Sequence, residues 1–255
     1  MSEPTTPKAE TDEVVPDWQR RIVDRSLESA RVRSIDRGSQ LIRAAATVLE
    51  RTNGESLTVQ EVADVAGQSL RTLYQYFASK DDLLLAVYEE SMRVYAKLID
   101  GLIAKLDDPI ERLAGGVIVA ARMPTMHGTV GVDRGLSHLR LHLGQSKPEL
   151  IARSQEPVTL VFRTLVEGAL AAQDAPALSV EAGTYFVSSA RTGWIVSSTL
   201  GNEYAVELPG VIDLSFFCLS GLGFDLPRDW HEDVDRRLEL PTGEGRSILR
   251  ALAKG

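Results

Sequence analysis

The sequence predicts an all-α protein, with a short three-helix region near the N-terminus and a larger helical region after it. In several segments apolar residues recur at i, i+3, i+4 and i+7, which is the spacing of one helix face. Capping residues precede these segments, and glycine or proline often follows them. No segment shows the clear alternation of a β-strand. We therefore expect every regular element to be a helix.

Composition places the chain among ordinary globular proteins. Its residues are 44% hydrophobic and 25% charged. Its length of 255 residues is enough for one large domain or two small ones. The longest apolar run, 114–121, is far shorter than the roughly 20 residues that span a bilayer, and the N-terminus lacks the pattern of a secretory signal. Cys218 is the only cysteine, which excludes an internal disulfide and a cysteine zinc site. We expect a cytoplasmic protein with no membrane partner.

Charge is unevenly distributed along the chain. The net charge of −8 by itself argues against a nucleic-acid partner. Residues 17–80, however, contain ten basic and eight acidic residues, a net charge of +2, whereas residues 1–16 carry −3 and residues 81–255 carry −7. An acidic body with a mildly basic N-terminal module is compatible with DNA binding through that module alone.

Residues 1–33 precede the clearest helical pattern. Residues 1–16 are rich in proline and polar residues and are predicted to be a disordered tail. Residues 17–33 are compatible with a helix and form a basic extension, with Arg20, Arg21, Arg25, Arg31 and Arg33. Two interpretations stay open for the arginines of residues 17–37. They can belong to a solvated surface helix with opposite-charge pairs, or to an arm that contacts DNA phosphates or the minor groove.

Two helices are predicted between residues 34 and 66. The first ends at Asn53-Gly54, and its apolar face consists of Ile42, Ala45, Ala46 and Leu49. The second opens with a capping box, in which the Thr58 hydroxyl accepts from the amide of Glu61 and the Glu61 side chain reaches back. Gly67 ends this helix, where a left-handed residue is favoured.

A third helix follows after the short turn Gly67-Gln68-Ser69, in which Ser69 can act as the N-cap. This spacing predicts a helix-turn-helix. Leu73 and Phe77 form the buried edge of the third helix, and its outward residues are Arg71, Thr72, Tyr74, Gln75 and Tyr76. An arginine, hydroxyls and an amide on an anchored helix suit the DNA major groove.

A second capping box, Ser79 to Asp82, starts a long helix that should run from Lys80 to about Lys105 and brace the third helix. The remaining polypeptide also has helical patterns. They cover residues 109–122, 133–143, 148–173 with a break near Pro157, 180–200 and 208–222. Residues 123–131 are predicted to be a loop, and residues 225–255 a polar extension with at most a short helix.

Residues 40–90 resemble the DNA-binding domain of the TetR family of bacterial transcriptional regulators. The resemblance is carried by the stretch LTVQEVADVAGQSLRTLYQYFASKDDLLLAVYEE. Within it, the T-x-x-E-x-A-x-x-A-G turn, the T-L-Y-x-Y-F recognition helix and the S-K-D-x-L helix start stand in order without gaps. The resemblance covers about 50 of the 255 residues.

The resemblance implies which side chains contact DNA. Thr58, Tyr74, Tyr76 and Lys80 match positions that commonly contact phosphates in the family, and Leu70, Arg71, Thr72 and Gln75 match positions in the major groove. Gln68 departs from the family, which usually has a small apolar residue there, and it can add a contact or pack with its amide exposed. Leu70 has an alternative place in the core beneath Leu73. The candidate DNA contacts are Thr58, Gln68, Ser69, Leu70, Arg71, Thr72, Tyr74, Gln75, Tyr76 and Lys80.

The resemblance also implies that the C-terminal domain forms a homodimer through its last two long helices and binds a small ligand. The expected dimer residues are Phe186, Ser189, Gly193, Phe216 and Phe217. The candidate pocket residues are Met92, Tyr95, Met123, Met126, His127, Phe162, Tyr185 and Trp194. Because this set is mainly apolar, it favours an apolar or amphipathic ligand over a highly charged one.

Signatures of catalysis and metal binding are missing from the sequence. It contains no GxGxxG, P-loop, HExxH or GxSxG pattern. His138 and His142 share a helix face, but no carboxylate or cysteine completes a metal site at helical spacing, and Cys218 lies in an apolar run. We expect no metal, no cofactor and no enzyme activity.

The sequence therefore predicts residues 34–80 as an N-terminal three-helix helix-turn-helix DNA-binding domain. A larger helical ligand-binding and dimerisation domain, residues 81–224, follows it. The predicted function is that of a repressor that binds a pseudo-palindromic operator as a homodimer and is released by a small, largely apolar effector. A ligand-free repressor and a non-specific DNA-binding protein stay open as alternatives, and a small-molecule-processing enzyme is the most distant one.

Overall fold

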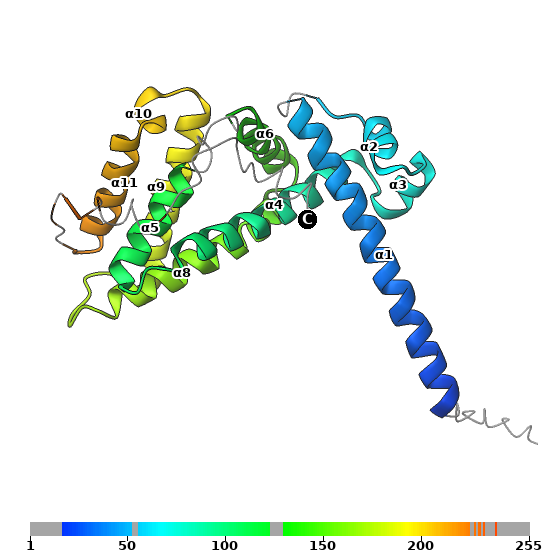
Figure 1. The fold of residues 1–255 in the computed structure, drawn as a ribbon, viewed down its shortest axis with the longest axis horizontal. Coiled ribbons are helices and arrows are strands. Elements are labelled where there is room, and N and C mark those ends of the chain that lie inside the picture. The colour runs from blue at the N-terminus through cyan, green and yellow to red at the C-terminus, as the bar shows by residue number, and fades with distance from the viewer. Residues whose placement is uncertain are drawn as a thin grey trace, which may run out of the picture. The chain divides into compact units, whose positions relative to one another are not determined.

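The computed structural model describes residues 17–52, 56–122 and 130–224, together with residues 227, 229, 230, 232 and 238. Within these residues all regular secondary structure is helical, which confirms the predicted fold class (Figure 1). The helices are α1 (Asp17–Arg51), α2 (Val59–Ala66), α3 (Leu70–Tyr76), α4 (Lys80–Ile103), α5 (Pro109–Arg122), α6 (Val130–Ser146), α7 (Pro148–Ser154), α8 (Glu156–Leu170), α9 (Val180–Thr199), α10 (Glu203–Val206) and α11 (Leu208–Gly221).

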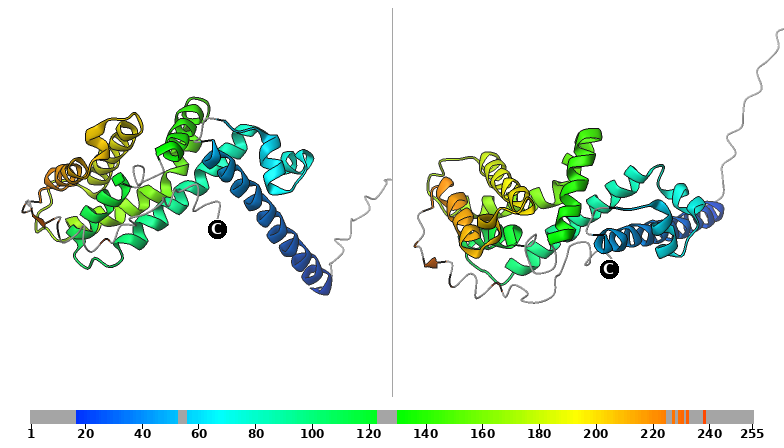
Figure 2. Two further views of the ribbon diagram at one scale, coloured as in Figure 1. Left: turned by 45° about the horizontal axis from the view of Figure 1, so that its top comes forward. Right: turned by 90° about the horizontal axis from the view of Figure 1, so that it is seen from above.

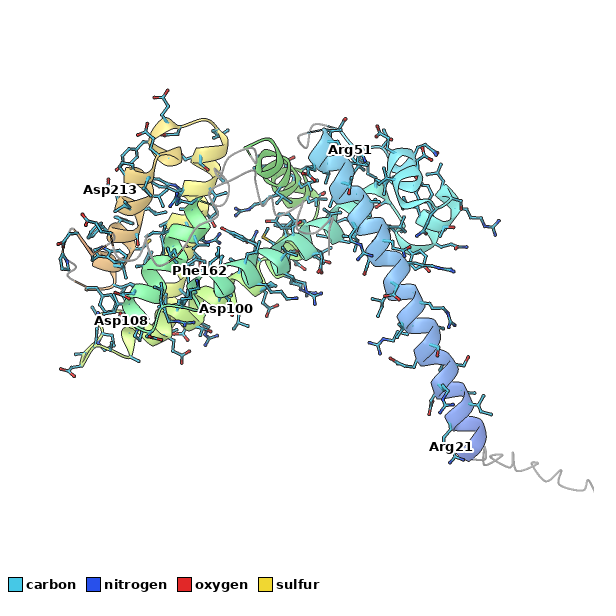
Figure 3. The ribbon with its side chains drawn as sticks, in the orientation of Figure 1. Arg21, Arg51, Asp100, Asp108, Phe162 and Asp213 are labelled. Atoms are coloured by element: carbon cyan, nitrogen blue, oxygen red, sulfur yellow. The ribbon has the colours of Figure 1, made fainter. Side chains whose placement is uncertain are left out.

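The chain divides into two compact units, residues 1–40 and residues 41–255. The described part of the first unit is the beginning of α1, in which every side chain from Arg21 to Arg37 is exposed (Figure 3). The sequence pattern suggested an extension up to residue 33 and a new helix after it, but α1 continues through this point without a break. From Leu41 onward α1 contributes buried side chains to the second unit.

Local hydrogen bonds explain where α2 begins and ends. The predicted capping box is present, since the Glu61 amide donates to Thr58 Oγ1 (3.2 Å) and the Thr58 amide donates to Glu61 Oε2 (3.0 Å). Gly67 ends the helix with φ of +63°, a left-handed conformation that glycine adopts without a Cβ clash. The chain can therefore turn within three residues into α3.

The helices from α4 to α11 form the helical body, residues 80–224, in which α5 is central. It contacts α4, α8, α9 and α11. Figure 2 shows the ribbon from two further sides. All residues of α5 from Leu113 to Ala121 are buried. The long apolar run in the sequence is therefore a helix enclosed by others, and no described helix is long and apolar enough to cross a membrane.

The helix boundaries in the body agree with the sequence patterns to within a few residues. The predicted break near Pro157 lies at Gln155, between α7 and α8. The helix predicted over 133–143 is longer in the structure, where α6 spans Val130–Ser146. The single-turn helix α10 was not predicted, because four residues are too few to show a periodic pattern. The predicted loop residues 123–129 lie outside the described residues.

Cys218 is buried on α11, and burial raises the pKa of its thiol to about 12. Because the thiolate is the reactive form, we expect Cys218 to react with a disulfide reagent such as Ellman's reagent far more slowly in the folded protein than in the unfolded one. The measurement is the rate at which the coloured thionitrobenzoate anion is released from the reagent at pH 8, with and without denaturant. Similar rates in both states would show that Cys218 is accessible and reactive.

Candidate nucleic-acid interface

Helix α3 presents one polar face to solvent. Arg71, Tyr74 and Gln75, at i, i+3 and i+4, are all exposed, and Tyr74 as a whole residue is 51% exposed. Leu73, on the opposite side, is fully buried. An amphipathic helix of this kind is anchored from beneath, so its outward side chains are held in fixed positions for a partner.

Two of the predicted contacts lie toward the inner side of α3. Leu70 and Tyr76 are half-buried and pack against the hydrophobic core, as Phe77 does. For Leu70 this placement matches the alternative of a core role beneath Leu73. Tyr74 and Tyr76 therefore differ in exposure, a difference that the motif alone does not reveal.

The turn between α2 and α3 is fixed by its own hydrogen bonds. The Ser69 hydroxyl accepts from the Thr72 amide (3.1 Å) and lies 2.9 Å from Thr72 Oγ1, so both hydroxyls have a local partner. Gln68 is half-buried, with its Oε1 atom inaccessible, and its backbone N–H donates to the backbone carbonyl of Ala63 (2.9 Å). Gln68 and Ser69 thus help to fix the turn between α2 and α3, and this role is independent of any contact with DNA.

Two further predicted contacts flank the α2–α3 pair. Thr58 is exposed at the start of α2, where its hydroxyl donates to Glu61 Oε2 (2.7 Å). This hydroxyl and the Thr58 amide hold the pKa of Glu61 below its usual value. Lys80 is exposed in the first turn of α4 and forms no ion pair with a described residue. Its ammonium group is therefore available to an external anion, such as a phosphate.

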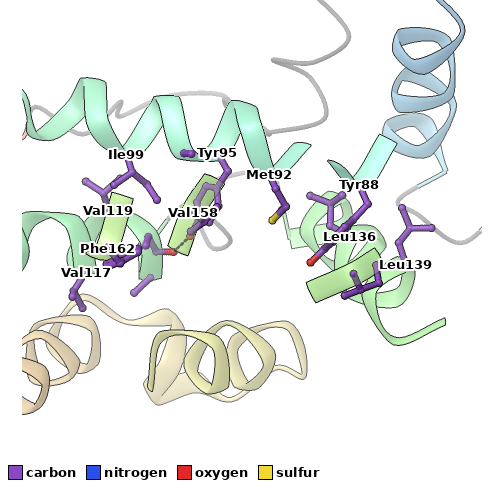
Figure 4. Close-up of a cluster of buried hydrophobic side chains, with 14 of the residues drawn as sticks. Tyr88, Met92, Tyr95, Ile99, Val117, Val119, Leu136, Leu139, Val158 and Phe162 are labelled. Carbon is purple, nitrogen blue, oxygen red and sulfur yellow. Dashed lines mark hydrogen bonds between the residues drawn. The ribbon is translucent and has the colours of Figure 1, made fainter. Parts of the chain in front are cut away.

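The predicted pocket residues are only partly brought together. Met92, Tyr95 and Phe162 are buried in the body, and Figure 4 shows Met92 on α4 between Tyr88 and Tyr95. Trp194 is half-buried instead against Tyr204, with ring centroids 5.8 Å apart. Tyr185 points outward and is 67% exposed, so its predicted place in a pocket is wrong. The remaining three candidates, Met123, Met126 and His127, lie outside the described residues.

The outer sides of α9 and α11 carry exposed apolar residues. Phe186, Ser189 and Gly193 follow one another along the exposed face of α9, and Phe217 on α11 is 71% exposed. Phe216, which the sequence placed in the same group, is half-buried and packs edge-on against Trp230. Figure 3 marks Asp213, which lies on the outer side of α11 one turn before Phe217.

Two polar contacts connect α6 and the residue before α7 with the first turn of α4. Lys147 forms an ion pair with Asp82, which lowers the pKa of Asp82, and His142 Nε2 lies 3.3 Å from Asp81 Oδ1. The residues of each pair are more than 60 positions apart in the chain, so no local pattern could indicate them. These contacts tie α6 and the following residues to the helix end that carries Lys80.

Comparison with protein families gives an independent description of the three-helix region. Residues 41–87 match the family model for bacterial regulatory proteins, tetR family. The HTH-type transcriptional regulator HbdR of Aromatoleum sp. (strain CIB) is 32% identical over 82 residues, which are 32% of this chain and 36% of that protein. The chain thus aligns with about a third of this relative's length.

Solved structures resemble the chain over a greater length. The structure of RolR with the ligand resorcinol has a TM-score of 0.57 and 17% identity, covering 84% of this chain and 98% of that one. The regulator FadR of Bacillus halodurans has a TM-score of 0.54 and 21% identity, covering 72% and 98%. FadR of Bacillus subtilis in complex with stearoyl-CoA has a TM-score of 0.52 and 20% identity, covering 72% and 96%. At these identities the similarity shows a shared fold, which includes the helical body.

Proposed function

We propose that this chain, whose residues 41–87 match the family model for bacterial regulatory proteins, tetR family, is a member of that family and a ligand-responsive repressor that binds a two-fold-symmetric DNA operator as a homodimer. The observation that carries DNA binding is the exposed face of α3, with Arg71, Tyr74 and Gln75 held above the buried Leu73. A side chain set of this kind can donate to and accept from base edges in the major groove. Lys80 would neutralise a phosphate beside it.

The dimer would form through the outer sides of α9 and α11. An exposed group of large apolar side chains on a protein usually marks an interaction surface. Small residues such as Ser189 and Gly193 between Phe186 and Phe217 would let helices of two subunits approach closely. Two subunits related by a two-fold axis would present two α3 helices to successive major grooves.

Ligand control would act through α4, because this helix joins the two functions. Its first turn carries Lys80, and its later turns bury Met92 and Tyr95 in the body. A ligand that displaces α4 within the body would shift α3 and break the spacing of the two DNA-reading helices. To lower operator occupancy it must prefer the released state, with a coupling free energy of roughly 1–3 kcal/mol. The complexes of RolR with resorcinol and of Bacillus subtilis FadR with stearoyl-CoA, two proteins of similar fold, support a small ligand for this chain.

The direct test is to find the operator. We expect the purified protein to retain a small set of genomic fragments and to protect an inverted repeat in nuclease footprinting, with half-sites about 10 base pairs apart or a multiple of that. Equal retention of random and genomic fragments would support the non-specific binding protein instead. Failure to bind DNA at low salt would refute the proposal.

Replacement of Lys80 tests the phosphate contact. Lys80→Ala should weaken binding to the operator and to random DNA by similar factors, and it should reduce the slope of log Kd against log salt concentration by about one. Lys97→Ala, which removes an exposed lysine further along the same helix, is the matched control and should leave both values unchanged. A preference lost at one base pair only would show that Lys80 reads a base.

A further inference from the structure

Arg191 is a cation buried inside the body. It lies on α9 and is only 5% exposed, on the side of the helix opposite the exposed Ser189 and Gly193. Its guanidinium carbon lies 5.2 Å from the centroid of the Phe162 ring, a cation–π contact. Phe162 is itself fully buried, within the apolar cluster of Figure 4. The charge of Arg191 is therefore in the interior, away from water.

One buried donor of the Arg191 side chain lacks an acceptor. Its Nε atom is buried and has no hydrogen-bond partner. Among the ion pairs of the described residues, none includes Arg191. The Phe162 ring attracts the positive charge of the guanidinium, but it supplies no oxygen acceptor for the buried Nε–H group. Burial of a charge without a partner is unfavourable, and an added acceptor near the guanidinium would offset this cost.

Neighbouring groups make the same region rich in donors and positive charge. Tyr88 is 2% exposed and accepts a hydrogen bond from Gln155 Nε2. Burial raises the pKa of Tyr88, and the positive charges of Arg140 and Arg191 oppose this, which shows that both cations lie within electrostatic range of its hydroxyl. Ser188, on the turn of α9 before Arg191, also has a buried hydroxyl oxygen without a partner. An anion would satisfy these groups, whereas a cation would be repelled.

We propose that the effector is an amphipathic organic anion, whose carboxylate binds to the guanidinium of Arg191 while its apolar part lies against the aromatic and aliphatic side chains around Phe162. This inference rests on the proposed function and refines it, because the sequence alone favoured a largely apolar ligand. A carboxylate suits the site, since the planar fork of a guanidinium donates two parallel hydrogen bonds to its two oxygens.

The experiment compares carboxylates with neutral molecules of the same shape. The probes are the straight-chain alkanoates from hexanoate to tetradecanoate and the corresponding primary carboxamides. At a hundredfold excess over Kd, at least one alkanoate should raise the Tm of the wild-type protein by roughly 5–10 °C. Its carboxamide should raise the Tm by less than a third of that value. The same alkanoate should release the protein from its operator in a gel-shift assay.

Three variants assign the effect to Arg191. Arg191→Met should bind the effective alkanoate about 30-fold or more weakly. Without ligand its Tm should equal or exceed that of the wild type, because an unpaired buried charge is removed. Arg191→Lys keeps the charge but not the two-pronged geometry, and it should bind at least tenfold more weakly, which provides a test if the methionine variant does not fold. Arg163→Met, at an exposed arginine next to Phe162 in the chain, is the matched control and should behave as the wild type.

The inference is overturned if no alkanoate stabilises the wild type more than its carboxamide does, or if both Arg191 variants keep full alkanoate binding. A measurement of operator binding in the absence of alkanoate distinguishes a wrong effector class from a wrong proposed function. A protein that binds its operator but shows no preference for carboxylates refutes only the anionic effector. A protein that does not bind DNA refutes the regulator itself.

Discussion

Gly193→Glu should convert the protein to monomers and nearly abolish operator binding. Gly193 lies on the exposed face of α9. Apart from its two chain neighbours and its own helix backbone, no atom of the subunit lies within 4 Å of the position that a Cβ would occupy, so the folded subunit has room for the new side chain. In a dimer formed through this face, however, each glutamate would be buried near its symmetry mate, and two unpaired carboxylates would oppose association. Loss of the second DNA-reading helix should weaken operator binding by about 10²–10⁴-fold.

The control for this variant is Gly101→Glu. Gly101 is also an exposed helical glycine with open space around it, but it lies on α4, away from α9 and α11. Both changes replace glycine by a better helix former, so neither should unfold the subunit. Light scattering after size exclusion gives the oligomeric state, and a gel shift gives the operator affinity. Gly193→Glu protein that remains dimeric would show that the subunits associate through another surface.

The local signals in the sequence were sufficient for the three-helix region because its helix ends are determined by neighbouring residues. Thr58 with Glu61, Gly67 and Ser69 each act within four positions of the chain, and each has the predicted role in the structure. The order of the body helices could be predicted for the same reason, since proline and polar stretches separate long periodic segments.

The orientation of an individual side chain depends on its angular position around the helix and on how the helices pack. The residue types alone do not reveal either. In the pair Phe216 and Phe217 the sequence supplies two equivalent aromatic residues, yet only Phe217 faces outward, while Phe216 packs on Trp230. Tyr185 and Phe186 were assigned to different sites, but both are exposed on α9. A one-position shift along a helix rotates a side chain by about 100°, so adjacent residues can reach different surroundings.

Arg191 could not be recognised from the sequence for a related reason. An arginine in a polar and small-residue stretch such as SSARTG is typical of a solvated helix face. Only the packing of α8 against α9 places this arginine over the buried Phe162. Long-range packing thus determines the polar features of the body, whereas the DNA-reading surface follows from a local motif.

Arg71→Ala should remove sequence preference at one base pair in each half-site. Arg71 is exposed one turn before Tyr74 and Gln75, on the side of α3 opposite the buried Leu73, and it forms no ion pair with a described residue. An arginine in this position can donate two hydrogen bonds to guanine O6 and N7, a pair of acceptors that no other base presents in the major groove. The change should cost about 1–3 kcal/mol on the operator and much less on random DNA.

The measurement is competition binding with every single-base variant of the operator, for the wild type, Arg71→Ala and Arg71→Lys. A lysine keeps the positive charge, so if Arg71 contacts a phosphate, Arg71→Lys should restore most of the affinity with the wild-type preference. If Arg71 reads guanine through its planar fork, Arg71→Lys should retain the salt dependence but lose much of the discrimination at the same position as Arg71→Ala. Arg153→Ala, at an exposed arginine of α7, should change neither quantity. An Arg71→Ala protein that binds all sequences more weakly by one common factor would place Arg71 on the phosphate backbone, and base recognition would then fall to Tyr74 and Gln75.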